Sequence, residues 1–349
     1  MVSLLLTLGR HDPLATAQDH MARRCASQLE RRGIRWRSLA HEHGLDLSRP
    51  HREGARVLAC SQDAFIRDAE RLAGDPYLGW SLGAWDLRDL GLFGYSLLNA
   101  PDVGAALDMM TERSVVMSEA SNFVLRVDGE EVLLGQRFAA NAAMSAAMLH
   151  FFLTLMHQLV GPGFEPLRLG VHQTDQAWLD SLGEQIGRNV EGVAAPITYM
   201  TFRAAVLDRP IAGADAAMLR TLDRGWDRER QGIEANRALL ARVETAIVRL
   251  LPSEVPSMSR IAALLGIATE QLADRLARMG LCLHDIVDAV RARLALRLLA
   301  RPNVTLMQAA HVLGFGDAKA FINAYLRWWG TPPLNARGQS LPDSRHGRA

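Results

Sequence analysis

The fold is decided by residues 306–329, LMQAAHVLGFGDAKAFINAYLRWW, together with an earlier stretch that repeats their pattern. In each copy, apolar residues recur at the spacing of one helix face and are followed by a glycine. The later stripe is Leu306, Ala309, Ala310 and Leu313 with Gly314, and the earlier one, 48 positions before, is Met258, Ile261, Ala262 and Leu265 with Gly266. Glycine enters a tight turn at positive φ without a steric penalty. Each copy therefore predicts a helix that ends in a tight turn.

A second helix follows the turn in both copies. After one inserted residue its apolar positions correspond at an offset of 49: Leu272, Leu276 and Met279 match Phe321, Tyr325 and Trp328. A further apolar helix near 284–300 joins the copies through Ile286, Val287, Val290, Leu294 and Leu298. No strand pattern occurs after about residue 239. We expect an all-α C-terminal domain over residues 236–340, with two helix-turn-helix units joined by a linker helix.

A helix-turn-helix presents the outer face of its second helix to the major groove of DNA. That face is Thr269, Glu270, Ala273, Asp274 and Ala277 in the first copy, and Ala318, Lys319, Ile322, Asn323 and Leu326 in the second. A rigid linker helix would set the two elements about one DNA turn apart, ~34 Å. Helical hairpins also repeat in proteins that bind no nucleic acid, so periodicity alone leaves both readings open.

Charge is unevenly distributed along the chain. Residues 251–349 hold 12 basic and 7 acidic residues, net +5, whereas the rest of the chain is net −4. Lys319 is the only lysine, so the excess is almost all arginine, which suits bidentate contacts to phosphate or guanine. A bias this complete can equally reflect the base composition of the genome. The C-terminal part favours a polyanionic partner.

The N-terminal two thirds mix helix and strand patterns. Residues 123–138 form two extended runs around Asp128-Gly129, which predicts a hairpin. Short strands are expected at 167–172 and 196–202, and a buried helix near 143–160. Residues 209–236 turn polar and are expected to form a helical or linker approach to the second domain. We expect an α+β domain over residues 1–235.

Composition excludes several classes of protein. Apolar residues at 49% and charged residues at 22% of 349 are ordinary for a globular protein, so neither disorder nor a membrane protein is indicated. The one long apolar segment, 139–160, is interrupted by polar side chains, and the run Val2–Leu8 lacks the marks of a signal peptide. We expect a cytoplasmic protein without a membrane partner.

Motifs for catalysis and metal binding are missing from the sequence. Cys25, Cys60 and Cys282 are odd in number and show no CxxC spacing, and GxSxG, HExxH and phosphate-binding glycine loops are likewise missing. We expect no enzyme activity, no cofactor and no metal.

The C-terminal segment resembles the DNA-binding domain of AraC/XylS-type transcription regulators. The resemblance covers Ser257 to Arg337 and is carried by MSRIAALLGIA, LHDIVDAVRARLALRLLA and LMQAAHVLGFGDAKAFINAYLRWWGTPPLNAR. Its signature residues here are Leu313-Gly314-Phe315-Gly316-Asp317, Phe321, Tyr325, Gly330, Pro333 and Arg337, with Arg291 and Ala295 on the linker helix. This resemblance implies that double-stranded DNA is a partner.

The N-terminal part more weakly resembles the effector domain of one branch of that family, the branch with arabinose-binding-type N-terminal domains. The matching pieces are LAGDPYLGWSLG at 72–83, LGLFGYSLLNAPDVGAAL at 90–107 and PITYMTFRAAVLDRPI at 196–211. The resemblance implies a small-molecule effector, a homodimer formed through this domain, and activation through contact with RNA polymerase.

The chain departs from the family pattern on both recognition helices. Ala268 replaces a serine, Asp274 stands where an arginine usually faces DNA, and Glu270 adds a second acid. Asn323 stands where arginine is common, and Ala336 replaces an aromatic residue. Either the DNA site is unusual or the first element makes little base contact, and we favour the second reading because phosphate repels carboxylates. The candidate DNA-binding residues are Thr269, Glu270, Ala273, Asp274, Arg278, Ala318, Lys319, Ile322, Asn323 and Arg327.

Effector-binding candidates come from the N-terminal domain. His150 and His157 lie two helical turns apart, too far for an i, i+4 metal site, and either sit on the helix surface or give polar tips to an apolar pocket. Trp80, Trp85, Phe93 and Tyr95 form an aromatic group that is either core or pocket lining. The effector candidates are Trp80, Phe93, Tyr95, His150 and His157, and we expect a small, largely apolar effector with a polar or anionic end.

Three functions are consistent with these patterns. The leading one is a ligand-gated, sequence-specific transcription activator. The alternative is an interaction protein with impaired DNA binding that acts by heterodimerising with other regulators. A third is an enzyme with a regulatory DNA-binding tail.

Overall fold

A computed structural model describes residues 14–48, 55–137, 142–173, 175–251, 253–301, 303–329 and 332–333. These residues fall into two compact units. The N-terminal unit runs from Thr16 to Ile233 without the short segment Ala55–Cys60. The C-terminal unit contains Leu14, Ala15, that segment, and the described residues from Glu234 onward.

The N-terminal unit is built on a five-stranded sheet. Its order is β3-β4-β7-β5-β6, and only the β5–β6 pair is parallel. The strands are β3 (Phe123–Asp128), β4 (Glu131–Arg137), β5 (Arg168–Val171), β6 (Glu191–Gly192) and β7 (Ile197–Arg203). β3 and β4 form a hairpin whose turn contains Gly129 at φ +60°, a conformation that favours glycine. The expected hairpin and the two expected strands near 167 and 196 are confirmed.

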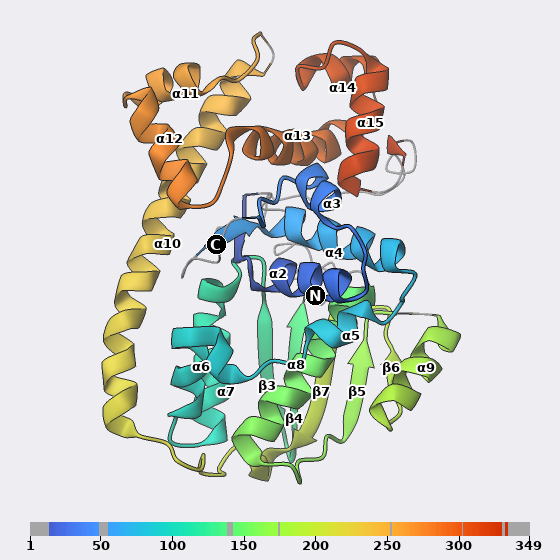
Figure 1. Ribbon diagram of the computed structural model, residues 1–349, viewed down its shortest axis with the longest axis vertical. Helices are drawn as coiled ribbons and strands as arrows, with labels where there is room; N and C mark the ends of the chain where they lie inside the picture. The colour runs from blue at the N-terminus through green and yellow to red at the C-terminus, as the bar shows by residue number, and fades with distance from the viewer. Residues whose placement is uncertain are drawn as a thin grey trace. The chain divides into compact units, whose positions relative to one another are not determined.

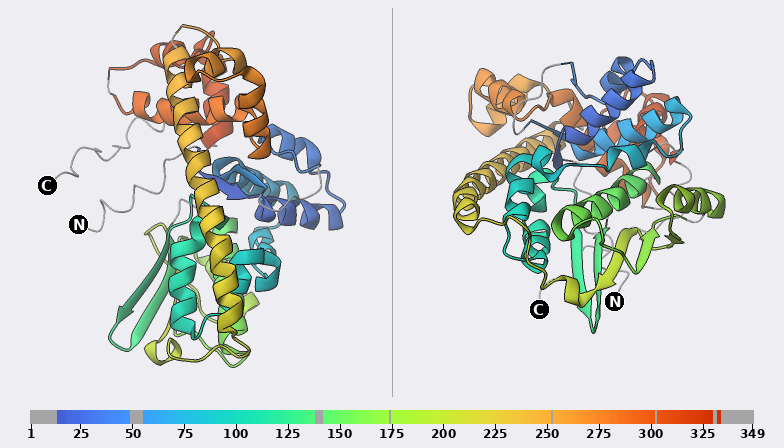
Figure 2. Two further views of the ribbon diagram at one scale, coloured as in Figure 1. Left: turned by 90° about the vertical axis from the view of Figure 1, so that its left-hand side faces the viewer. Right: turned by 60° about the horizontal axis from the view of Figure 1, so that its bottom comes forward.

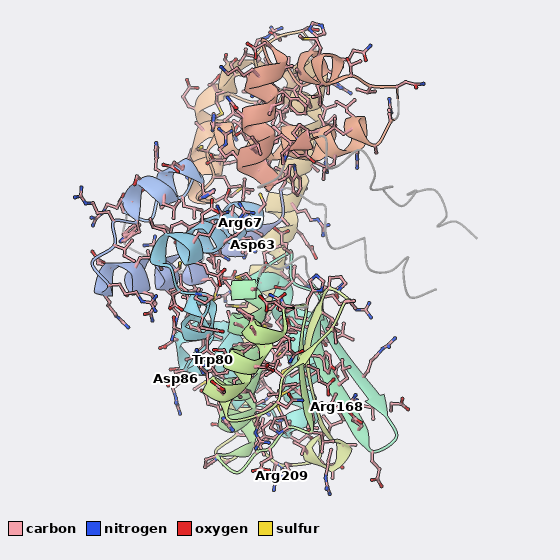
Figure 3. All side chains as sticks on the ribbon, turned by 90° about the vertical axis from the view of Figure 1, so that its right-hand side faces the viewer. Asp63, Arg67, Trp80, Asp86, Arg168 and Arg209 are labelled. Carbon is pink, nitrogen blue, oxygen red and sulfur yellow. The ribbon has the colours of Figure 1, made fainter. Side chains whose placement is uncertain are left out.

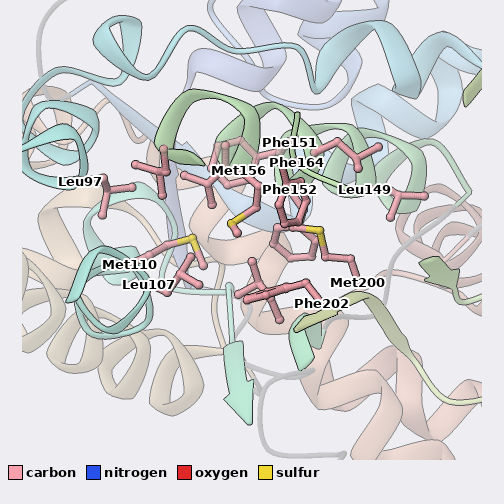
Figure 4. Packing of buried hydrophobic residues seen from close by; sticks show 14 of the residues in the cluster. Leu97, Leu107, Met110, Leu149, Phe151, Phe152, Met156, Phe164, Met200 and Phe202 are labelled. Atoms are coloured by element: carbon pink, nitrogen blue, oxygen red, sulfur yellow. The ribbon is translucent and has the colours of Figure 1, made fainter. Parts of the chain in front are cut away.

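Helix α8 (Ala142–Val160) packs on one face of this sheet, and its side chains fill the core. Leu149, Phe152 and Met156 are fully buried and meet Met200 and Phe202 of β7 (Figure 4). By length and apolar composition α8 would qualify as a membrane span, but 67% of its most apolar window is buried inside the structure. The helix is therefore a core element, as the polar interruptions in its sequence predicted.

Shorter elements complete the N-terminal unit. Leu107 and Met110 of α7 belong to the same core as α8 (Figure 4). The elements are β1 (Thr16–Gln18), α2 (His20–Arg31), α3 (Arg37–Glu42), α4 (Ala59–Ala73), α5 (Leu78–Leu82), η1 (Leu87–Leu90), α6 (Gly91–Leu98), α7 (Val103–Met117), α9 (Gln176–Ile186) and η2 (Ala204–Val206).

Helix α10 (Ala216–Leu250) is a single helix of 35 residues that begins in one unit and ends in the other (Figure 2). In its first half Trp226 is buried and donates its indole N–H to Ser96 Oγ at 2.7 Å. In its second half Val243 and Ile247 are fully buried in the C-terminal unit. The polar approach predicted at 209–236 is therefore mostly helix.

The C-terminal unit contains five further helices, and α13 lies between the other two pairs (Figure 1). They are α11 (Met258–Leu265), α12 (Thr269–Arg278), α13 (Leu283–Leu299), α14 (Leu306–Val312) and α15 (Ala318–Trp329). Ile286 and Val290 of α13 belong to the core of the first pair, whereas Ala295 and Leu299 belong to the core of the second. The linker helix is thus part of both cores.

The structure confirms an α+β domain followed by an all-α double helix-turn-helix. It adds one feature that the sequence did not predict: the strand β2 (Arg56–Leu58) belongs to the C-terminal unit, where Leu58 packs into the core of α11 and α12. Of the expected elements, Val2–Leu8 and the signature residues Gly330 and Arg337 lie outside the described residues, as does Ala336.

Candidate nucleic-acid interface

Local sequence signals set the ends of the helix-turn-helix elements. Gly266 ends α11 in the left-handed conformation at φ +70°, as the sequence predicted. Thr305 begins α14 with a capping box, in which its hydroxyl accepts from the Gln308 N–H at 3.1 Å and Gln308 Oε1 accepts from the Thr305 N–H at 2.8 Å. The Asp317 carboxylate accepts from the Ala320 N–H at 2.7 Å, at the start of α15. By contrast, Ala268 at the start of α12 provides no side-chain cap.

The repeat includes the helix before each helix-turn-helix, which sequence reasoning missed. Arg242 of α10 donates from Nη2 to the carbonyl oxygen of Leu265 at 2.8 Å. Arg291 of α13, 49 positions later, donates from Nε to the carbonyl oxygen of Leu313 at 2.9 Å. Each repeat therefore consists of a support helix followed by the two helices of one helix-turn-helix. Arg242 and Arg291, 49 positions apart, were the sequence feature that could have revealed this longer repeat.

Arg291 also lies over the ring of Phe315, 4.8 Å from its centroid. Burial lowers the pKa of its guanidinium, while the nearby Asp288 opposes that effect. Arg291 is thus placed to hold the turn of the second unit from within the protein.

The first recognition helix, α12, has Glu270, Asp274 and Arg278 on its exposed surface, with Thr269 and Ala273 half-buried. Asp274 and Arg278 form an ion pair: Nη2 lies 2.7 Å from Oδ2 and Nε lies 3.3 Å from Oδ1. The carboxylate expected to repel phosphate is therefore neutralised by a neighbouring cation.

The second recognition helix, α15, exposes Lys319 and Asn323, with Ala318 and Ile322 half-buried beside them. Arg327 forms an ion pair with Asp288 of α13, and Trp328 Nε1 approaches the same carboxylate at 3.4 Å. Since a partner inside the protein already holds its guanidinium, Arg327 is less available to DNA than Lys319.

Two effector candidates lie together in the N-terminal unit. The rings of Trp80 and His150 stack with centroids 4.0 Å apart, and His150 Nδ1–H donates to the carbonyl oxygen of Trp80 at 2.7 Å. Burial lowers the pKa of His150, so its imidazole is neutral near pH 7. α5 and α8 approach closely here because Gly79 and Gly83 face α8: a Cβ on Gly83 would lie 2.0 Å from the Ala147 carbonyl oxygen.

The remaining effector candidates are dispersed. Phe93 is buried in the core beside Trp226, with ring centroids 6.3 Å apart. Tyr95 is 43% exposed, and His157 is exposed with its ring edge-on to Phe164. The structure thus brings together Trp80 and His150, but not the full predicted set.

Two residues that the sequence reasoning did not select hold the turn after α5, which lies between Trp80 and Asp86 (Figure 3). Arg24 donates to the carbonyl oxygen of Ala84 and lies over the Trp85 ring, 4.5 Å from its centroid. Gln158 donates from Nε2 to the Trp85 carbonyl oxygen at 2.7 Å. Gln158 was visible as a polar residue in an apolar helix, whereas nothing in the sequence singled out Arg24.

None of the three cysteines is joined to another by a disulfide. Cys25 is buried, while Cys60 and Cys282 are exposed. The Cys282 thiol donates to Asp285 Oδ2 at 2.8 Å. Over the part of the chain that the structure describes, no three His, Cys, Asp or Glu side chains are grouped so as to hold a metal ion.

Two family models match this chain. "Arabinose-binding domain of AraC transcription regulator, N-term" matches residues 33–211, and "Helix-turn-helix domain" matches residues 261–339. The first alone spans more than half of the 349 residues. The chain belongs to the AraC/XylS-type transcription regulators, and its C-terminal unit is a DNA-binding module of that family.

Named relatives are also regulators. The ornithine utilization regulator of Pseudomonas aeruginosa is 25% identical over 278 residues, covering 77% of this chain and 80% of that protein. The HTH-type transcriptional regulator VirS of Mycobacterium tuberculosis is 34% identical over 129 residues, 37% of each chain. The crystal structure of transcriptional regulator CdpR from Pseudomonas aeruginosa has a TM-score of 0.38 and 21% identity, covering 78% of this chain and 91% of that one.

Proposed function

We propose that this protein is a cytoplasmic, homodimeric transcription activator that reads two successive major grooves of its operator and is gated by a small-molecule effector. The observation that carries this proposal is that α13 contributes side chains to the cores of both helix-turn-helix units. Shared cores keep the two recognition helices at one spacing. A helix of 17 residues is about 26 Å long, so its ends suit elements separated by about one DNA turn, ~34 Å.

Base reading is assigned to the exposed surfaces of α12 and α15. On α15, we assign the exposed Asn323 to pair with adenine, and the exposed Lys319 to bind phosphate or guanine. The ten candidate residues named from the sequence remain the proposed contact set. Within it, Arg327 is the weakest member because Asp288 of α13, whose side chain is only 15% exposed, holds its guanidinium against the protein.

Effector gating is assigned to the N-terminal unit, with Trp80 and His150 as the paired candidates. His150 and the Trp80 indole give a mostly apolar surface, and Arg24 lies near enough for its charge to help burial lower the pKa of His150, which favours a small, largely apolar effector with one polar or anionic end. The relative named for ornithine utilization makes ornithine a compound to include. RNA polymerase is the proposed partner for activation.

The heterodimerising alternative was motivated by the acidic first recognition helix. The ion pair between Asp274 and Arg278 weakens this argument for impaired DNA binding, because the charge of the carboxylate is compensated within its own helix. No observation on the described residues favours an enzyme.

The test is a mobility-shift assay of the full chain on the DNA flanking its own gene, over a range of salt concentrations. We expect specific binding that weakens steeply with salt, and Asn323→Ala should relax preference at one base position. Binding equal on flanking and unrelated DNA would refute sequence-specific regulation. Solution mass of the full chain tests the dimer, and melting-temperature shifts with organic acids, amines and ornithine test the effector class.

A further inference from the structure

The ion pair on α12 has a geometry with consequences for base recognition. Arg278 is 77% exposed and Asp274 57% exposed, so both side chains lie at the surface that a partner would meet. Two contacts join them: Nη2 to Oδ2 at 2.7 Å and Nε to Oδ1 at 3.3 Å. The carboxylate therefore takes the Nε/Nη2 edge of the guanidinium.

A guanidinium carries N–H donors on more than one edge. The edge that Asp274 takes uses Nε–H and one Nη2–H. The two terminal nitrogens then still point one N–H each in parallel, away from the carboxylate. Parallel donors of this kind match the O6 and N7 acceptors of guanine in the major groove.

The pairing also moves the guanidinium along the helix. Side chains on a helix lean toward its N-terminus, so the surface covered by a residue lies over the preceding turn. Arg278 is the last residue of α12, and its ion pair with Asp274 brings its charged end back to the middle of this ten-residue helix. That position is closer to the N-terminal part of a recognition helix, which contacts base edges.

We infer that Asp274 is a positioning residue that holds Arg278 to read a guanine, which makes α12 a base-reading element rather than a repelled one. This inference rests on the proposed DNA-binding function. The sequence favoured little base contact by the first recognition helix, because Asp274 was treated there as an unpaired carboxylate. The inferred role of Arg278 replaces that expectation.

The experiment is a binding-site selection from a random DNA library with the full-length protein and three variants. Arg278→Ala removes the proposed reader, and Asp274→Ala removes its positioning partner. Arg275→Ala removes a neighbouring exposed cation that forms no ion pair with any described residue. The selected wild-type site should hold one position restricted to guanine. Arg278→Ala and Asp274→Ala should both relax that same position, each losing roughly 5- to 150-fold of discrimination.

Arg275→Ala is expected to weaken binding to all sequences evenly and to leave every base preference intact. A role limited to helix stability would not relax one base position, so unchanged melting temperatures alongside relaxed specificity would support the inference. If Asp274→Ala tightens binding to all sequences and keeps the guanine preference, the inference is overturned. If the wild type selects no site at all, the proposed function fails first.

Discussion

Arg291 donates its Nε–H to the carbonyl oxygen of Leu313 at 2.9 Å, where α14 ends. A helix C-terminus leaves carbonyl groups without intrahelical partners and carries a partial negative charge. An arginine there donates hydrogen bonds to these carbonyl groups, and its positive charge offsets the partial negative charge. Arg242 does the same for Leu265 in the first unit. In both repeats, an arginine of the support helix therefore binds the carbonyl end of the first helix of the helix-turn-helix.

Loss of the Arg291 contact should destabilise the second helix-turn-helix unit. Arg291→Ala is expected to lower the free energy of unfolding by about 1–3 kcal/mol. The variant would leave the Leu313 carbonyl oxygen without its charged donor, and it would remove the guanidinium that lies over the Phe315 ring. Urea unfolding of the full chain measures the change. Arg297→Ala, on an exposed position of the same helix, should stay within about 0.5 kcal/mol. Equal losses in the two variants would contradict a capping role for Arg291.

The uncapped start of α12 offers a stabilising substitution. Ala268 has φ −65° and ψ 146°, the extended conformation in which a serine hydroxyl can accept from the first turn. Ala268→Ser is expected to raise the free energy of unfolding by about 0.5–2 kcal/mol. Differential scanning calorimetry is the measurement, and Ala277→Ser, near the other end of α12, is the matched control, which should give no gain. A gain from the control alone would show that capping is not the cause.

The close approach of α5 to α8 depends on glycine. In Gly83→Ala the new Cβ would lie 2.0 Å from the Ala147 carbonyl oxygen, so the helices must separate. We expect a loss of about 1–3 kcal/mol in the free energy of unfolding, the usual range for overpacking. Gly163→Ala is the control because no heavy atom lies within 4 Å of its Cβ position. A neutral Gly83→Ala would mean that α5 does not rest on α8.

Glu70 should make stability depend on pH. Its Oε1 is buried without a hydrogen-bond partner among the described residues, and burial, assisted by Asp75, raises the pKa of its carboxyl from 4.5 to about 7. The folded state therefore holds the proton more tightly, and this contribution is present below pH 4.5 and lost as the pH rises through about 7.

Glu70→Gln imitates the protonated carboxyl at every pH. The variant should be more stable than the wild type at pH 8 by roughly 1–2 kcal/mol, a value reduced for partial solvent contact, and close to the wild type at pH 5. Thermal unfolding at the two pH values checks this. Glu184→Gln, at an exposed position of α9, is the control for the change of side chain itself. A constant difference across pH would refute ionisation as the cause.

Much of the fold was predictable because it follows from local rules. The hairpin at Asp128-Gly129 and the repeated stripes that end at Gly266 and Gly314 depend on side-chain periodicity and turn chemistry, which are written along the chain. The same rules predicted that α8 is a buried helix. Identification of the candidate site was less complete: its exposed faces were found, but not which charges on them are already paired.

The two pairings have different origins. Asp274 and Arg278 are four residues apart on one helix, so their ion pair is a local contact that the sequence spacing permits without requiring. Arg327 is bound by Asp288, 39 residues away, and this pairing depends on the tertiary structure. The dispersal of Trp80, Phe93 and Tyr95 has a similar origin, because ring contacts depend on how helices pack and not on distance along the chain. The order of residues along the chain was enough to predict the α+β part, the all-α part and the repeated helices, since periodicity specifies which face of each element is buried, and the family resemblance added the prediction of DNA binding. The tertiary structure decided which polar groups are free to meet a ligand, because that depends on contacts between segments far apart in the chain.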